Sequence, residues 1–320
     1  MTVFSPFEKQ LMLNLIRQSL RYKGKTFPNP VVGAAVYQQN TLISTGYHQG
    51  NGLAHAEVVA LKKAGQQSQG ASLMVTLSPC THYGKTPPCV DAIIKAGISK
   101  VIFPLIDIHP ATTIRNIVDV LKEAGIQVMI GLCKENAFKA NAGYFSSIAH
   151  QKPLIHLKVG MSLDGMIADQ NYPDRYITSD TSLKQVHRLR REMQAIIVGI
   201  GTILTDDPQL NIRYRLYRKG YTLPKRIVLD PMGRTPLSAR VLDPQYGGDT
   251  IICISSRCPS PNKKRLRSVA TVWELPETAY GLDWHPLLQR LGALNLQDVL
   301  IEGGQKIFSS ALAEQIVDWG

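Results

Sequence analysis

Apolar and polar positions along the first 130 residues follow the pattern of an α/β protein. Residues 5–8 (SPFE) have the form of a capping box with proline at the first helical position, and apolar residues follow at helical spacing. Short apolar runs bounded by turn residues then alternate with further helical patterns. This order predicts a layered α/β domain with a largely parallel sheet. The expected strands are 31–37, 41–46, 73–77, 100–104 and 127–130, and the expected helices are 6–20, 54–64, 88–97 and 114–124.

A second α/β block follows a mostly helical connector over residues 134–151. It starts at Pro153 and again mixes short apolar strands with helical patterns. With the boundary placed between 148 and 153, we expect two domains, residues 1–148 and 153–320. In the second domain, strands are expected at 154–159, 195–198, 226–229, 250–254, 270–275 and 299–301, and helices at 183–193 and 306–312.

Length and composition agree with two globular domains in a reducing compartment. The chain has 320 residues, 44% of them apolar and 19% charged, and a common domain has roughly 150 residues. No stretch approaches the roughly 20 apolar residues of a membrane helix, and the first residues lack the pattern of a signal peptide. Five cysteines are few for a disulfide framework. We therefore expect a cytoplasmic protein without a membrane partner, in which clustered Cys and His indicate metal or catalytic groups.

The net charge of +12 favours anionic partners. Two basic runs, at 213–226 and 257–267, contribute much of it. They are consistent with nucleic acid, with a phosphorylated small substrate, or with a solvated surface that binds nothing. Because the chain lacks an aromatic-rich basic face on which bases could stack, no nucleic-acid partner is expected.

The strongest chemical signal is a set of possible zinc ligands. His55-Ala56-Glu57 is followed by Pro79-Cys80 and by Cys89, which is the residue pattern of zinc deaminases. His55, Cys80 and Cys89 would leave the fourth tetrahedral position to water, as in a catalytic zinc site. Zinc lowers the pKa of such a water toward roughly 7 and makes hydroxide available. Glu57 is placed to carry the proton from the water to the departing ammonia.

Each of these residues, taken alone, can also be interpreted as a structural residue without a chemical role. A single buried His or Cys is more often an ordinary core residue than a ligand. The combination of all four, with His55 and Cys89 at predicted helix starts and Cys80 just after a strand, favours a zinc-dependent nucleobase-type deaminase.

The segment between the two cysteines narrows this class. SPCTHYGKTPPC at 78–89, with NPVVGAAV at 29–36, GYHQ at 46–49 and HAEVVAL at 55–61, closely resembles the bifunctional deaminase–reductases of riboflavin biosynthesis. Past residue 150, LKVGMSLDGMIA, YITSD, LRRE, IIVGIGTILTDDPQLNIR and IEGG resemble the reductase domain of the same family. The resemblance implies a cytidine-deaminase-like three-layer domain followed by a dihydrofolate-reductase-like α/β domain. It also implies zinc-dependent deamination of a phosphoribosylated diaminopyrimidinone and NADPH-dependent reduction of its ribosyl group to a ribityl chain.

The resemblance assigns further residues to the two sites. Near the zinc it implies that Asn29, His48 and Lys85 contact the pyrimidine or the ribose phosphate. The alternative interpretations are a turn Asn, a surface His and a surface Lys, and for His48 the two interpretations have equal weight. Lys158 would stabilise developing charge in the reductase, unless it is a structural strand-edge Lys. The implied substrate residues of the reductase are Arg190, Leu210, Arg213 and Glu302, and its cofactor residues are Gly160, Tyr176, Thr202, Asp206, Gly303 and Gly304.

Elementary chemistry supports part of this assignment. The guanidinium groups of Arg190 and Arg213 can each fork onto a phosphate. Gly303-Gly304 precedes a predicted helix, whose N-terminus suits a pyrophosphate. The short Gly199-Ile200-Gly201 segment is only a weak dinucleotide signal, because the full Rossmann pattern is incomplete.

The chain departs from the family pattern at several places. Ser78 stands where the family has Glu, residues 107–110 read DIHP instead of DPNP, and residues 111–120 replace a Gly-rich segment. The family's reductase continues past 316–318 into further strands, so we expect the second domain to be truncated at Gly320, with C-terminal strands missing. One alternative therefore remains open: a deaminase only, whose degenerate second domain serves oligomerisation or binding. In either case we expect a homo-oligomer that acts on a phosphorylated pyrimidine.

Overall fold

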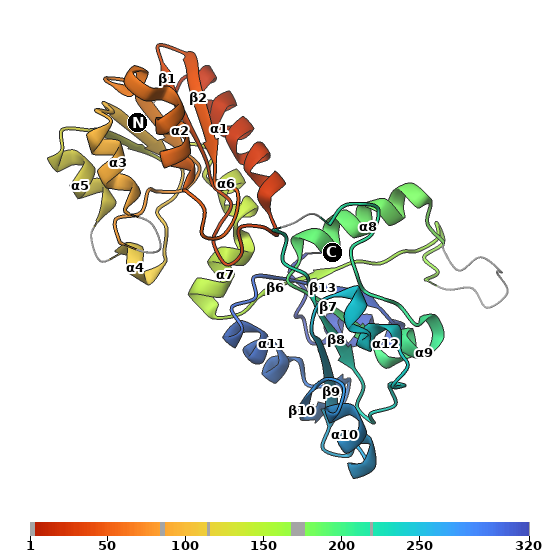
Figure 1. Cartoon of the computed structure of the whole chain (residues 1–320). Helices are drawn as coiled ribbons and strands as arrows, with labels where there is room; N and C mark the ends of the chain where they lie inside the picture. The colour runs from red at the N-terminus through yellow and green to blue at the C-terminus, as the bar shows by residue number, and fades with distance from the viewer. Residues whose placement is uncertain (1–3, 84–86, 114–115, 168–176, 218–219, 320) are drawn as a thin grey trace. The chain divides into compact units, whose positions relative to one another are not determined.

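The chain folds into two compact α/β units, each with its own sheet and core (Figure 1). A computed structural model describes residues 4–83, 87–113, 116–167, 177–217 and 220–319. The first unit is Met1–Ala149 and the second is His150–Gly320. The α/β class predicted from the sequence is confirmed.

The first unit contains a five-stranded sheet in the order β2-β1-β3-β4-β5. Strand β1 pairs antiparallel with β2 and β3, whereas β3–β4 and β4–β5 are parallel. The sheet is therefore mixed, with more antiparallel pairing than the sequence pattern indicates. Gln39 and Asn40 both have positive φ, as a two-residue hairpin turn of type I′ requires. The strands are β1 (Gly33–Gln38), β2 (Thr41–Tyr47), β3 (Ser72–Val75), β4 (Lys100–Phe103) and β5 (Gln127–Ile130).

Helices cover both faces of this sheet and make three layers. Met12 and Leu15 of α1 pack with residues of α6 against one face, and α2, α3 and α5 bury apolar residues against the other. The predicted capping box is confirmed, because Ser5 Oγ accepts from the Glu8 backbone N–H and Glu8 Oε2 accepts from that of Ser5. The helices are α1 (Pro6–Ser19), α2 (Ala56–Ala64), α3 (Cys89–Lys95), α4 (Pro110–Thr113), α5 (Ile117–Glu123), α6 (Lys134–Ala140) and α7 (Ala142–His150), with the 3₁₀ helices η1 (Leu20–Tyr22) and η2 (Gly65–Ser68).

Gly46 sets the position of helix α2 on the sheet. A Cβ atom at this position would lie 2.2 Å from the Ala56 carbonyl oxygen and 2.4 Å from the Ala60 nitrogen. Only glycine therefore lets strand β2 approach the first turn of α2 this closely. The Ser44 hydroxyl adds a 2.7 Å hydrogen bond to the Ala60 carbonyl. Together these contacts fix the start of the helix that carries the first candidate ligand.

The second unit contains a six-stranded sheet in the order β10-β9-β8-β7-β13-β6. All of its ladders are parallel, so the carboxyl ends of the strands share one edge. Trp319 makes a single parallel bridge to His156 of β6. The strands are β6 (Leu154–Leu157), β7 (Ala195–Gly199), β8 (Lys225–Leu229), β9 (Thr250–Ser255), β10 (Thr271–Leu275) and β13 (Asp298–Gly303), and a separate small hairpin comprises β11 (Glu277–Thr278) and β12 (Gly281–Leu282).

The helices of the second unit include three that the sequence reasoning did not predict. Helices α8 and α12 match the predicted segments 183–193 and 306–312, whereas α9, α10 and α11 were missed. Residues of β7, β8, β9, α9 and α10 form one apolar cluster of this unit. The helices are α8 (Asp180–Glu192), α9 (Ile200–Asp206), α10 (Ser260–Arg267), α11 (Trp284–Ala293) and α12 (Gln305–Ala313), with the 3₁₀ helices η3 (Arg240–Leu242) and η4 (Pro244–Tyr246).

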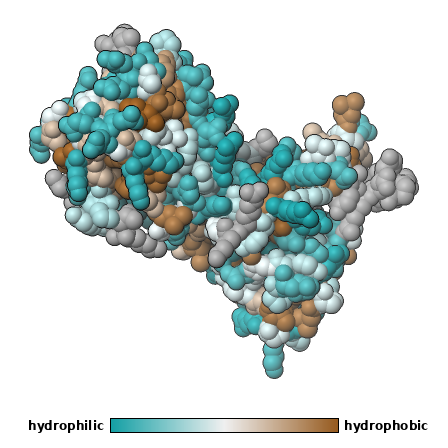
Figure 2. All heavy atoms as spheres, turned by 45° about the horizontal axis from the view of Figure 1, so that its top comes forward, coloured by the Kyte–Doolittle hydropathy of each residue, from teal (hydrophilic) through white to brown (hydrophobic). Residues whose placement is uncertain are grey.

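The surface is mixed in polarity. Figure 2 shows one face of each unit as mostly hydrophilic, with hydrophobic side chains in small groups. Among the described residues, no helix has both the length and the apolar character that crossing a membrane demands. The segment that follows β6 exposes Met161, Leu163 and Met166.

Candidate active sites

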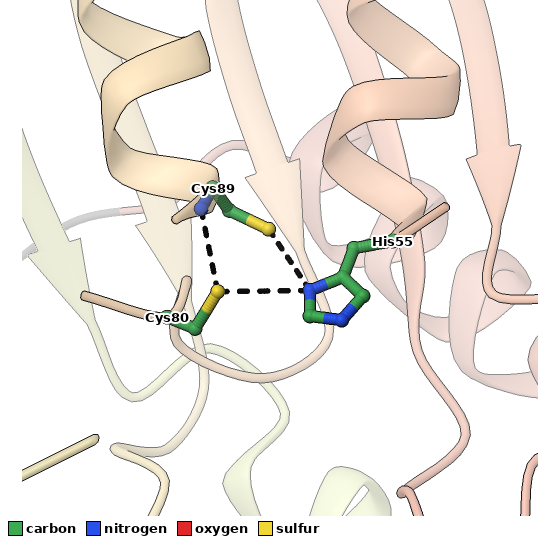
Figure 3. Close-up of side chains that lie close together, drawn as sticks. All are labelled: His55, Cys80 and Cys89. Carbon is green, nitrogen blue, oxygen red and sulfur yellow. Dashed lines mark hydrogen bonds between the residues drawn. The ribbon is translucent and has the colours of Figure 1, made fainter. Parts of the chain in front are cut away.

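The three predicted zinc ligands lie together in the first unit (Figure 3). His55 is the N-cap residue of α2, and Cys89 is the first residue of α3. Cys80 lies in the segment that follows β3. The His55 Nδ1 atom is 3.1 Å from Cys89 Sγ and 3.6 Å from Cys80 Sγ. The sheet and the starts of two helices thus bring residues from three segments to one point.

This arrangement fits a tetrahedral metal ion. Zinc bond lengths of about 2.1 Å to nitrogen and 2.3 Å to sulfur place tetrahedral N and S ligands about 3.6 Å apart, near the observed distances. The Cys89 backbone N–H donates to Cys80 Sγ over 3.3 Å. A hydrogen bond from the Cys89 side chain, together with His55, lowers the pKa of Cys80 to about 4, although burial acts in the opposite direction. The same hydrogen bond and burial raise the pKa of Cys89. The described residues offer one nitrogen and two sulfur donors and no fourth ligand in this cluster, which is typical of a catalytic zinc site.

Glu57 lies beside this cluster in the first turn of α2, with only 3% of the residue exposed. Burial, reinforced by the negative charge of Cys80, raises the pKa of Glu57 to about 7. A hydrogen bond links it to the Cys89 side chain. A carboxyl group in such surroundings can take up and release a proton near neutral pH.

Asn29 and His48 form a second layer beside His55. The His48 Nδ1 atom is 3.2 Å from the Ala54 carbonyl oxygen, which can only accept, so Nδ1 carries the proton. His48 Nε2 must then accept from Asn29 Nδ2, 3.2 Å away. Burial lowers the pKa of His48, and its ring packs edge-on to that of His55 at 5.5 Å. The structure therefore brings Asn29 and His48 to the cluster, while Lys85 lies outside the described residues.

The positions that depart from the family pattern contact each other. Ser78 Oγ accepts from the Asp107 backbone N–H at 2.8 Å, and Asp107 Oδ1 accepts from the Tyr144 hydroxyl and the His109 backbone N–H. The ring of His109 stacks on that of His82, whose Nδ1 is buried without a hydrogen-bond partner among the described residues. Sequence reasoning missed this pair, because no spacing rule links two histidines in separate loops.

The candidate residues of the second unit gather at the carboxyl edge of its sheet. Lys158 directly follows β6, and Glu302 lies near the end of the neighbouring strand β13. Arg190 of α8 donates two hydrogen bonds to the Glu302 carboxylate, of 2.6 Å from Nε and 2.5 Å from Nη2. The two side chains are only 10% and 5% exposed. Burial opposes ionisation of Glu302, yet the charge and hydrogen bonds of Arg190, with the charge of Lys158, hold its pKa below the usual value.

Leu210 and Arg213 lie in the loop that follows α9. Leu210 is buried. Leu210, Asp207, Tyr214 and Arg215 all have positive φ. Such backbone strain in residues other than glycine is characteristic of functional loops. Both the backbone N–H and the side-chain Nε of Arg213 face the ring of His187.

Three of the predicted cofactor residues, Gly303, Gly304 and Thr202, lie together at the same sheet edge. A Cβ atom on Gly303 would lie 2.9 Å from Thr202 Oγ1, so the glycine and the first turn of α9 are in close contact. Gly304 has a φ of 94° and is the N-cap of α12. Asp206 lies one helical turn beyond Thr202. Gly160 lies in the segment after β6, and Tyr176 lies outside the described residues.

Some residues of the two basic runs make contacts that stabilise the fold. The buried Arg226 side chain donates to the carbonyls of Asp243 and Gly248. Arg257 forms a bidentate pair with Glu277. These contacts give part of the positive charge a structural role.

Fold and site together define the class of each unit. The cytidine and deoxycytidylate deaminase zinc-binding region matches residues 7–105, and the RibD C-terminal domain matches residues 153–320. The first unit is thus a zinc-binding domain of the deaminase type, and the second is a RibD-type reductase domain. The chain belongs to the riboflavin biosynthesis protein RibD family, as its motifs predict.

Relatives match almost the whole chain. Riboflavin biosynthesis protein RibD of Aquifex aeolicus is 37% identical over 311 residues, which cover 97% of this chain and 85% of that protein. The Escherichia coli protein is 33% identical over 320 residues, covering 97% and 85%. Among solved structures, Acinetobacter baumannii RibD has a TM-score of 0.83 at 35% identity, covering 98% of this chain and 85% of that chain. The Thermotoga maritima diaminohydroxyphosphoribosylaminopyrimidine deaminase/5-amino-6-(5-phosphoribosylamino)uracil reductase has a TM-score of 0.81 at 31% identity, covering 96% and 84%.

Proposed function

We propose that the chain catalyses two consecutive steps of riboflavin biosynthesis. The first is deamination of a phosphoribosylated diaminopyrimidinone, and the second is NADPH-dependent reduction of the ribosyl group to the ribityl side chain. The observation that carries this proposal is the cluster of His55, Cys80 and Cys89 beside the buried Glu57, in a chain of the RibD family. The Thermotoga relative bears the names of both activities.

In the deaminase unit, His55 Nδ1 and the two cysteine thiolates would hold zinc. The ion, when bound, supplies an activated water at neutral pH. Glu57 then moves the proton to the exocyclic nitrogen that leaves as ammonia, and its buried position keeps bulk water from competing. Because the NH₂ group of Asn29 faces His48 and donates to it, the amide oxygen of Asn29 would be the group that accepts from the pyrimidine. Lys85 would pair with the phosphate.

In the reductase unit, NADPH, when bound, supplies the hydride. The Gly303–Gly304 turn, Thr202, Asp206, Gly160 and Tyr176 would hold it, and the start of α12 suits its pyrophosphate. Lys158 would stabilise charge on the sugar oxygen during reduction. Arg213, with Leu210 beside it, would bind the substrate phosphate. Since both oxygens of Glu302 accept from Arg190, Glu302 acts by holding that guanidinium in place.

We infer that this enzyme works in the cytoplasm on a phosphorylated pyrimidine, without nucleic acid, and as a homo-oligomer. All five of its cysteines are free, which agrees with a reducing compartment. The alternative is a deaminase only, in which the second unit serves oligomerisation or binding.

An NADPH titration followed by tryptophan fluorescence separates the two proposals. The three tryptophans, Trp273, Trp284 and Trp319, all belong to the second unit, so they report on that unit alone. We expect saturable quenching that a Thr202→Trp substitution at the Gly303 contact abolishes, with a corresponding surface change at Ser268 as control. Titration without saturation would contradict the reductase and leave the deaminase-only alternative.

A further inference from the structure

His187 is a buried histidine for which the sequence motifs assign no role. It lies on α8, is 3% exposed, and faces the loop that carries Arg213. Its Nδ1 is 3.1 Å from the Arg213 backbone nitrogen, and its Nε2 is 3.2 Å from Arg213 Nε. The Tyr214 ring packs edge-on against it at 5.1 Å. One imidazole therefore contacts both the main chain and the side chain of the same arginine.

These two contacts compete for the ring. Burial, and then the charges of Arg190 and Arg213, lower the pKa of His187 to about 4, against the charge of Glu302 and a hydrogen bond to the Asn211 backbone, so the ring is neutral at physiological pH. A neutral imidazole has one acceptor and one donor nitrogen. Both groups of Arg213 that face it are donors, so only one of them can be accepted at a time.

Of the two Arg213 donors, the backbone N–H is the one that the His187 ring accepts from. It is part of a loop in which Leu210 and Tyr214 have positive φ, and a partly buried N–H that loses its acceptor costs free energy. The guanidinium has other donors and can turn to another acceptor. When His187 Nδ1 accepts from the backbone, Nε2 carries the proton. Nε2–H and the Nε–H of Arg213 are then both donors and form no hydrogen bond with each other. The ring then holds the arginine's main chain and leaves its guanidinium available.

The loop is fixed from the same helix by a second contact. Arg190, one turn along α8 from His187, donates from Nη1 to the Asn211 carbonyl at 3.0 Å. Its Nε and Nη2 atoms donate to the Glu302 carboxylate. Helix α8 thus anchors the loop at Asn211 and at Arg213, on either side of a single residue.

We propose that His187 is a positioning residue, whose Nδ1 holds the backbone of Arg213 so that the guanidinium is presented to the phosphate of the reductase substrate. This inference rests on the proposed reductase function. It concerns binding, because His187 contacts Arg213 and not the reacting carbon. The ring acts through the arginine and supplies no proton to the reaction.

Two substitutions separate the ring nitrogens. His187→Asn keeps an acceptor at the place of Nδ1, whereas His187→Gln places its amide near Nε2 and removes that acceptor. For 5-amino-6-(5-phosphoribosylamino)uracil we expect His187→Gln to raise KM about tenfold with little change in kcat, because a charge-assisted contact is misplaced. We expect His187→Asn to keep a KM near that of the unchanged chain. With the substrate that lacks the phosphate, the two variants should not differ.

Other kinetic outcomes would overturn the proposal. Equal KM values for the two variants would mean that Nδ1 has no special part. A fall in kcat at constant KM, or an equal loss with the dephosphorylated substrate, would remove the link to phosphate binding. Unfolding followed by tryptophan fluorescence identifies a variant that has lost its fold.

The protonation of the His187 ring can be measured in the unchanged chain without a substrate, and a variant is needed only to assign the signal. In protein labelled with ¹⁵N-histidine, long-range ¹H–¹⁵N correlation distinguishes a ring protonated at Nε2 from one protonated at Nδ1. We expect the Nε2–H form for His187, identified by the signal that disappears in His187→Asn or His187→Gln. The Nδ1–H form would contradict the proposal. The Nε2–H form without any NADPH-dependent reduction would instead refute the reductase and leave the contact with Arg213 intact.

Discussion

Replacing Glu57 by glutamine is expected to abolish deamination while zinc stays bound. The amide has the shape of the carboxyl group but cannot take up a proton, so the rate should fall by about a hundredfold to ten-thousandfold. Because Glu57 is not one of the three clustered ligand residues, metal content should remain about one zinc per chain. Ammonia release and zinc analysis of the same preparation check both parts.

Two comparisons make this result specific. Cys89→Ala should lose both zinc and deamination, since it removes a ligand that is fully buried in the cluster. Glu57→Gln should still oxidise NADPH with a substrate that is already deaminated, because the second unit is unchanged. Deamination at the normal rate in Glu57→Gln would remove Glu57 from its proposed role.

Replacing Glu302 by alanine is expected to destabilise the second unit by about 3–5 kcal/mol, because a buried Arg190 charge loses its partner. The effect is large since both carboxylate oxygens are engaged and both side chains are nearly inaccessible. Folding lowers the pKa of Glu302, so the stabilisation is present above the ordinary carboxyl pKa and is lost as pH falls below it. Urea unfolding followed by tryptophan fluorescence, at neutral and at acid pH, measures both effects.

A surface pair of the same unit provides the control. Glu274 accepts from Lys263 at 2.9 Å and is 44% exposed. Glu274→Gln should therefore cost less than about 1 kcal/mol. If Glu302→Ala and Glu274→Gln were equally stable, the buried pair would not have the importance that its geometry indicates.

Local signals were sufficient for much of the first unit. The capping box at residues 5–8 is a consequence of neighbouring residues, and it was predicted. The zinc ligands were predicted because zinc chemistry requires a few residue types at restricted spacing. The antiparallel pairing of β1 with β3 was not, since it depends on which distant strand lies beside it.

The second unit shows why the rest could not be predicted. Helix α11 has apolar residues at helical spacing, at Trp284, Leu287 and Leu291, and this periodicity is the local signal by which it could be predicted. The hydrogen-bonded ion pair of Arg190 and Glu302 joins residues 112 positions apart, and no local pattern predicts it. His187 gave no signal, because its role depends on a loop 26 residues away. Such contacts are products of the tertiary fold.

The most direct test supplies the diaminopyrimidinone phosphoribosyl substrate to the purified chain, with and without NADPH. Ammonia release and NADPH oxidation are followed in the same reaction. The proposed function predicts ammonia in both cases, and with NADPH present it predicts oxidation that follows ammonia mole for mole. Ammonia without NADPH oxidation would support the deaminase-only alternative, and no ammonia from a zinc-loaded chain would contradict the account centred on His55, Glu57, Cys80 and Cys89.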